Sequence, residues 1–174
     1  MNKKWMALAL ALVMVLSSVS VLASSPSITT SDLTSDGGTL DTAVVSAISQ
    51  HIASTGGAAI DYFGDDIEKQ VARLLPSGVS AKNLVLYEAV AINTASYTES
   101  QLKSGISIDV PSGFADGATV IILVGIPDGL GGVEWFPVKA TVSRGQLSLK
   151  LSSKVAKKFA ASREPATFAV FGAA

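Results

Sequence analysis

The hydrophobic periodicity of this chain changes near residue 78, and this change is the strongest constraint on its fold. Before residue 78, apolar residues recur at spacings of three and four, which is typical of amphipathic helices. After it, short apolar runs are separated by Gly, Pro and Asp turn signals, which is typical of strands. We therefore expect an α+β chain whose two N-terminal helices precede a β-sandwich or partial barrel.

Two amphipathic helices are predicted before the change. The first has Thr39 or Asp41 as its cap and ends at Gly56, and its apolar stripe comprises Leu40, Val44, Val45, Ile48 and Ile52. The second begins with Asp65 or Asp66 as its N-cap and ends at residues 76–78, and its stripe comprises Ile67, Val71 and Leu74.

Six segments after residue 78 have the pattern of strands, namely 83–94, 106–110, 118–126, 134–142, 146–151 and 166–171. In the first of them, Leu86 and Val90 are expected on one face and Tyr87 and Ala89 on the other. Residues 152–165 interrupt the strands with Val155 and Phe159 on one side, which predicts one short inserted helix.

The N-terminus has the pattern of a secretory signal peptide. Lys3 and Lys4 precede an apolar run over residues 6–16, and small residues lead to a cleavage point after Ala23. We expect a secreted, extracellular protein with no transmembrane segment in the mature chain. The predicted organisation is a signal peptide (1–23), a Ser/Thr-rich flexible leader (24–39), a helical segment (40–78) and a β-sandwich domain (79–174).

The chain contains no cysteine, which excludes disulfides, thiolate catalysis and Cys-based zinc sites. Stability must therefore come from the hydrophobic core, and the residues that remain after cleavage are enough for one. Charge is unevenly spread: residues 24–102 carry a net charge of −6 and residues 103–174 a net charge of +3. Two interpretations remain open, a weak attraction between the two halves or an anionic partner for the basic half.

The glycine-rich loop at residues 125–132 follows an apolar run, as a phosphate-binding loop would. A phosphate loop needs a helix directly after it, because the helix N-terminus supplies the amide donors. Here the residues after Gly132 are strand-like and include Pro137, and no nucleotide-binding glycine motif is present. We predict a hairpin connection and expect neither a bound cofactor nor a nucleic-acid partner.

Catalytic and metal-binding patterns are weak. His51 is the only histidine, and Ser100 and Lys103 match a Ser-x-x-Lys pattern without its companion motifs. A small secreted hydrolase that uses His51 with Asp61 or Asp65 is the alternative to a non-catalytic protein. The acidic group of Asp61, Asp65, Asp66 and Glu68 offers oxygen ligands for calcium, but it lacks the spacing of a calcium loop, so no metal is expected.

Two features are candidates for binding. Trp135 and Phe136 are adjacent in a predicted strand and so face opposite ways, which leaves Trp135 as a candidate aromatic contact. Lys154, Lys157 and Lys158 lie at i, i+3 and i+4 of the inserted helix and are expected to form one patch for a polyanion. A solvated helix face and an aromatic core pair are the structural alternatives.

Strand and turn residues over about residues 83–174 give the chain a resemblance to small Ig-like β-sandwich modules of secreted and cell-surface proteins of Gram-positive bacteria. The matching positions are Asp116, Gly117, Val120, Trp135, Val142 and Gly145. The resemblance implies a mainly antiparallel Ig-like sandwich and no catalytic residues. We therefore expect a secreted, non-catalytic binding or structural module that acts at or near the cell surface, with an anionic cell-wall polymer or another surface protein as its partner.

Overall fold

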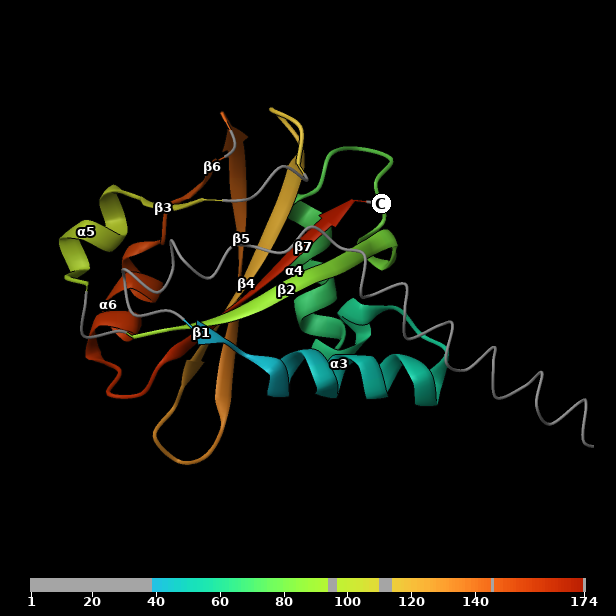
Figure 1. Cartoon of the computed structure of the whole chain (residues 1–174), viewed down its shortest axis with the longest axis horizontal. Helices are drawn as coiled ribbons and strands as arrows, with labels where there is room; N and C mark the ends of the chain where they lie inside the picture. Colours follow the sequence, from blue (N-terminus) through green and yellow to red (C-terminus); the bar gives the residue numbers. More distant parts are fainter. Residues whose placement is uncertain (1–38, 94–96, 110–113, 145, 174) are drawn as a thin grey trace, which may run out of the picture.

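Residues 39–93, 97–109, 114–144 and 146–173 are described from a computed structural model of the chain. The predicted signal peptide and the leader up to residue 38 lie outside these residues. Seven strands form one sheet in the order β1-β2-β7-β4-β5-β6-β3, and every pairing is antiparallel (Figure 1). The strands are β1 (Thr39–Leu40), β2 (Leu84–Ile92), β3 (Ile106–Asp109), β4 (Thr119–Pro127), β5 (Val133–Ser143), β6 (Gln146–Leu149) and β7 (Ala166–Ala173).

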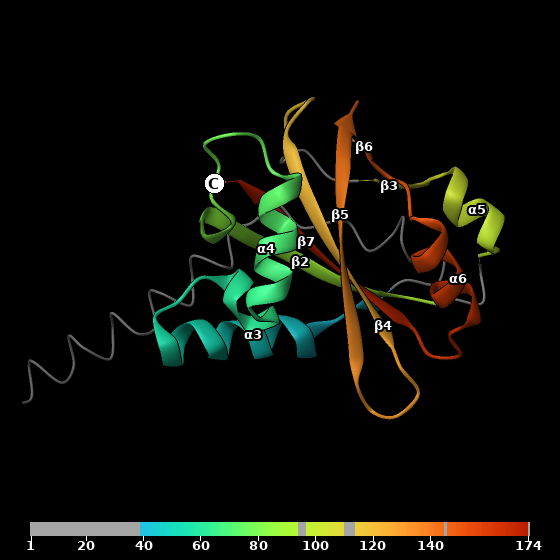
Figure 2. The ribbon, with the colours of Figure 1, turned by 180° about the vertical axis from the view of Figure 1, so that it is seen from behind.

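Helices cover both faces of this sheet. The helix α3 (Thr42–Thr55), the short 3-10 helix η1 (Ala59–Phe63) and the helix α4 (Asp65–Leu74) lie on one side, and η2 (Ala81–Asn83) leads into β2. The helices α5 (Glu99–Ser104) and α6 (Ser153–Ala161) pack on the other side. Figures 1 and 2 show these two groups of helices on opposite sides of the sheet. The predicted α+β class is therefore confirmed.

The central strand β4 explains why both faces need cover. Its residues from Val120 to Ile126 are all buried, because apolar side chains point to both sides. Ile121 and Leu123 share a core with Ile48, Ile60 and Val71 of the helical segment. Val120, Ile122 and Val124 instead meet Leu102 of α5 and Phe159 of α6. The N-terminal helices thus share one of the two cores with the sheet.

The expectation of two packed sheets needs correction. All the described strands belong to one hydrogen-bonded sheet, whereas a β-sandwich buries its apolar faces between two. Here helices supply the second layer on each side, because α3, α4 and α6 each present an apolar stripe that must also leave water. The inserted helix predicted at residues 152–165 is confirmed as α6, with Val155 and Phe159 buried.

A β-bulge in β2 reverses the predicted alternation. The pairing with β7 shifts between Leu86 and Glu88, so Tyr87 is the additional residue. Leu86 and Ala89 consequently lie in the core beneath α3 and α4, whereas Val90 lies in the opposite core. The prediction that Leu86 and Val90 share a face is therefore wrong.

The helix ends follow ordinary capping chemistry. Asp41 caps α3 by accepting a hydrogen bond from the backbone N–H of Val44 at 3.1 Å, as predicted. The N-cap of α4 is Gly64, not Asp65 or Asp66, which instead lie in the first turn. There their negative charges are favourable beside the positive end of the helix dipole.

The helix α5 was not predicted, although Thr98 and Gln101 carry its signal. The Thr98 side chain accepts a hydrogen bond from the backbone of Gln101, and the Gln101 side chain accepts one from the backbone of Thr98. Ser100 and Lys103 lie on this short surface helix. No helix in the described part of the chain has the length and apolar character needed to cross a membrane.

The loop at residues 125–132 is a hairpin turn, as predicted. Pro127 pairs with Val133, and Asp128 Oδ1 accepts hydrogen bonds from the backbone N–H groups of Leu130 (2.8 Å) and Gly132 (2.9 Å). These two bonds lower the pKa of Asp128. Gly129 and Gly131 have positive φ angles, which glycine adopts without strain. The strand β5 follows the turn directly, so no helix N-terminus faces the loop.

Candidate functional site

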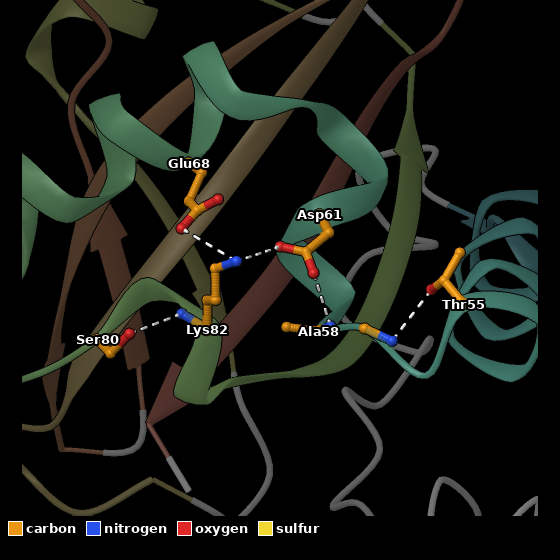
Figure 3. Close-up of polar contacts among 7 residues, drawn as sticks. Thr55, Ala58, Asp61, Glu68, Ser80 and Lys82 are labelled. Atoms are coloured by element: carbon orange, nitrogen blue, oxygen red, sulfur yellow. Dashed lines mark hydrogen bonds and ion pairs between the residues drawn. The ribbon is translucent and has the colours of Figure 1, made fainter.

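Four groups of side chains were candidates for a functional site, and the acidic group beside η1 is the most connected of them. Lys82 of η2 lies between two carboxylates, with its Nζ 3.7 Å from Asp61 Oδ1 and 3.9 Å from Glu68 Oε1 (Figure 3). The other oxygen of Asp61 accepts a hydrogen bond from the backbone N–H of Ala58 at 2.9 Å. Asp61 Oδ1 itself is buried and accepts no hydrogen bond, so Lys82 is its compensating group.

This arrangement ties three local elements together. Asp61 belongs to η1, Glu68 to α4 and Lys82 to η2, and all three precede the sheet strand β2. The ammonium group occupies the position between the carboxylates that a cation would take. Within the described residues, no three His, Cys, Asp or Glu side chains are grouped in a way that could hold a metal ion. The acidic group therefore has the geometry of a structural ion-pair cluster.

His51 packs at the end of a row of aromatic rings. Its ring lies edge-on to Tyr62 at 5.9 Å, Tyr62 contacts Phe63 at 5.1 Å, and Phe63 contacts Trp135 at 4.8 Å. No hydrogen bond or ion pair among the described groups joins His51 to Asp61 or to Asp65. The structure therefore does not bring together the His–Asp pair that the hydrolase alternative requires.

Trp135 lies half-buried over the sheet. Its ring packs against Phe63 and lies directly above Gly125 of β4, so that a Cβ added to Gly125 would come within 2.6 Å of the ring. Phe136 packs against the opposite core, as the strand alternation predicts. Most of the Trp135 ring is thus engaged inside the molecule, with part of its surface left to solvent.

The three lysines of α6 do not all face the same way. Lys158 forms an ion pair with Glu134, and the ammonium groups of Lys154 and Lys158 lie 5.8 and 5.6 Å from the centre of the Phe136 ring. These two lysines therefore face β5.

Lys157 of α6 lies nearer to α5. The pKa of Glu99 on α5 is lowered, first by its hydrogen bond and charge interaction with Lys103 and more weakly by Lys157. The expected single patch is therefore divided: Lys154 and Lys158 flank β5, whereas Lys157 flanks α5.

A second basic feature lies where β5 and β6 separate. Their pairing covers Thr141–Ser143 and Gln146–Ser148, with Thr141 opposite Ser148. Lys139 lies two residues before Thr141 in β5, on the same face of that strand, and Lys150 directly follows the last residue of β6. An open groove of about 450 Å³ lies here, lined by Ser104, Gly105, Lys139, Thr141, Ser148, Leu149 and Lys150. We call it the β5–β6 groove.

The β5–β6 groove has a surplus of positive charge. None of its lining residues is acidic, and neither Lys139 nor Lys150 forms an ion pair with another described residue. A Cβ on Gly105 would lie 3.7 Å from Cγ of Lys150, which places the aliphatic part of that lysine against the end of α5. Both lysine side chains are exposed, so their ammonium groups are available to a ligand.

Sequence reasoning missed Lys139 as a candidate. The alternation of side chains in β5 places Lys139 on the same face as Thr141, and this face could be predicted from the sequence. Its partner across the groove depends on the β5–β6 register, which the sequence pattern does not specify. Comparisons of the chain with protein-family models, curated proteins and solved structures returned no match.

Proposed function

We propose that the protein is a secreted, non-catalytic binding module that acts at or near the bacterial cell surface and contacts an anionic cell-wall polymer. The observation that carries this proposal is the set of lysines in the C-terminal half that form no ion pair with any described residue, namely Lys139, Lys150, Lys154 and Lys157. Flexible, strongly hydrated ammonium groups suit loose attraction to a polyanion better than bidentate recognition of a single group.

Secretion is supported by the signal-peptide pattern at residues 1–23. Mass spectrometry of the protein from the culture medium of its host should find a chain that begins at Ser24. A chain that retains Met1 and sediments with membranes would contradict both secretion and the surface role.

A non-catalytic role is supported by the state of the candidate catalytic groups. The carboxylate of Asp61 is already engaged by the backbone of Ala58 and by Lys82, and His51 packs edge-on against Tyr62. We expect His51→Gln to leave polymer binding unchanged, because the ring contributes packing only. Loss of an activity in a variant with an unchanged circular dichroism spectrum would instead favour the hydrolase alternative.

The resemblance to Ig-like surface modules stays a prediction about ancestry. The resemblance rests on strand and turn residues, whereas the lysines provide charge, and both favour a binding module at the cell surface. Another surface protein is the second candidate partner, and it would be indicated if protease treatment of the wall fragments abolished binding.

Sedimentation with purified wall fragments tests the proposed binding. The purified protein should sediment with the fragments at low salt and remain in the supernatant at high salt, because exposed charges are screened over about 8 Å at physiological ionic strength. The double variant Lys154→Glu/Lys157→Glu should bind less. Lys158 is left unchanged, because its ion pair with Glu134 would become a pair of like charges.

The matched control is Lys69→Glu/Arg73→Glu, which makes the same change in net charge on exposed residues of α4; because Lys69 loses an exposed ion pair with Asp66 (3.9 Å), circular dichroism should first show that this variant is folded. It should bind nearly as well as the wild type. If the wild type stays in the supernatant at low salt, or if both variants sediment alike, the proposed binding is wrong.

A further inference from the structure

We infer that the β5–β6 groove is a binding site for an oxyanion, either a phosphate or a carboxylate group. This inference deepens the proposed function, and the identity of the polymer that presents the oxyanion rests on that function. The groove itself is defined independently, by its lining residues and by the register of two strands.

The first argument is charge. Lys139 and Lys150 both line the groove that opens where the pairing of β5 and β6 ends at Thr141 and Ser148. Two like charges that line one groove repel each other, and solvent weakens this repulsion for exposed groups. No acidic residue lines the groove to offset them. An oxyanion bound in the groove would be attracted by both ammonium groups.

The contrast with Lys82 and Lys158 sharpens this point. Lys82 lies between Asp61 and Glu68, and Lys158 pairs with Glu134. These two lysines have carboxylate partners within the chain, and their charges serve the packing of local elements. Lys139 and Lys150 have none among the described residues, and they border an open groove.

The second argument is the supply of donors. Each ammonium group offers three N–H donors, and Thr141, which lines the same groove, carries a hydroxyl that can also donate. The groove volume of about 450 Å³ is in the range of small-molecule sites, so it accommodates a sugar phosphate or a sugar acid as well as a bare anion. Lysines act as point charges, so the site selects charge more than shape.

A single group should bind weakly, because the groove is open and its lysines are screened by solvent. A polymer carries many such groups, and binding of one raises the effective concentration of the next at the lysines of α6. Lys154 lies over Phe136, whose side chain points to the opposite face of β5 from Lys139, so the groove and Lys154 would engage different segments of one polymer.

Titration of the ¹⁵N-labelled protein with inorganic phosphate, followed by NMR, tests the site directly. We expect saturable shifts of the backbone amides of Gly105, Thr141 and Ser148. They should be lost in Lys139→Gln/Lys150→Gln and retained in the control Lys69→Gln/Arg73→Gln. Glycerol 1-phosphate and glucuronate, titrated separately, identify which oxyanion binds more tightly. Shifts that do not saturate with either class, or that persist in the groove variant, overturn the inference.

The sedimentation assay separates this inference from the proposed function. If Lys139→Gln/Lys150→Gln binds wall fragments like the wild type while Lys154→Glu/Lys157→Glu does not, the groove inference fails and the proposed function stands. If the groove binds phosphate but neither variant alters sedimentation, the oxyanion site stands and the wall polymer is the wrong partner.

Discussion

The acidic cluster beside η1 and the β5–β6 groove contain charged groups in opposite circumstances. In the cluster, Lys82 lies within 3.9 Å of a carboxylate on each side, and three neighbouring elements are tied together. In the groove, Lys139 and Lys150 line one open site that has no acidic lining residue. The difference indicates which charges serve the fold and which are left for a partner, and composition alone does not distinguish them.

The largest expected effects come from the two cores that support these regions. Phe159 of α6 is fully buried on one face of the sheet, and Ile60 of η1 is fully buried on the other. We expect Phe159→Ala to lower the free energy of unfolding by about 3–5 kcal/mol and Ile60→Ala by about 2–5 kcal/mol. Urea denaturation followed by circular dichroism measures both.

Because β4 contributes to both cores, each of these variants should unfold in a single transition at a lower urea concentration. Two separate transitions in either variant would contradict the account of one sheet shared by both groups of helices.

A smaller effect is expected where Trp135 crosses β4. Gly125→Ala places a methyl group against the Trp135 ring. Because this overpacks the site, we expect the free energy of unfolding, measured by urea denaturation, to fall by about 1–3 kcal/mol. Trp135→Leu in the same chain should recover part of this loss, because it removes the ring that the methyl group meets. An unchanged stability for Gly125→Ala would show that Trp135 points away from the sheet and is free to act as a binding surface.

The next effect compares the two kinds of lysine. Lys82→Gln should lower stability by about 0.2–1 kcal/mol, since Asp61 and Glu68 lose their shared cation. Lys139→Gln should leave stability unchanged, because Lys139 is exposed and forms no ion pair with another described residue. Equal losses in the two variants, measured by urea denaturation, would contradict the contrast between cluster and groove.

The smallest expected effect is the lowered pKa of Asp128 in the hairpin turn. The backbone N–H groups of Leu130 and Gly132 lower the pKa of Asp128 in the folded chain. A carboxylate with a lowered folded pKa contributes stability above its unfolded pKa, and this contribution is lost as the pH falls through the folded pKa. NMR titration of the Asp128 carboxyl carbon should give a midpoint below the usual range for aspartate. A midpoint in that range would mean that the turn is open.

Local patterns predicted most of the elements but not their arrangement. The stripes of α3 and α4 and the apolar run of β4 were readable because helix and strand periodicities differ. The short helix α5 was missed, since six residues give too little periodicity and only its capping box marks it. The sheet order places β7 between β2 and β4, a long-range choice that no local spacing encodes.

The same limit applies to the candidate sites. The lysines of α6 were predicted as one patch from their spacing, whereas their surroundings divide them between β5 and α5. Lys139 and Lys150 are eleven positions apart in the sequence, and only the strand register makes them neighbours across the groove. Sequence reasoning therefore found the basic half of the chain but not the β5–β6 groove.

The central claim is that lysines with internal partners support the fold and that lysines without them bind an anion. It is tested most directly by measuring stability and sedimentation with wall fragments on the same two proteins, Lys82→Gln and Lys139→Gln/Lys150→Gln. We predict that Lys82→Gln is less stable and binds like the wild type, whereas the groove variant is equally stable and binds less at low salt. If each variant loses both properties, or if their roles are exchanged, the claim is contradicted.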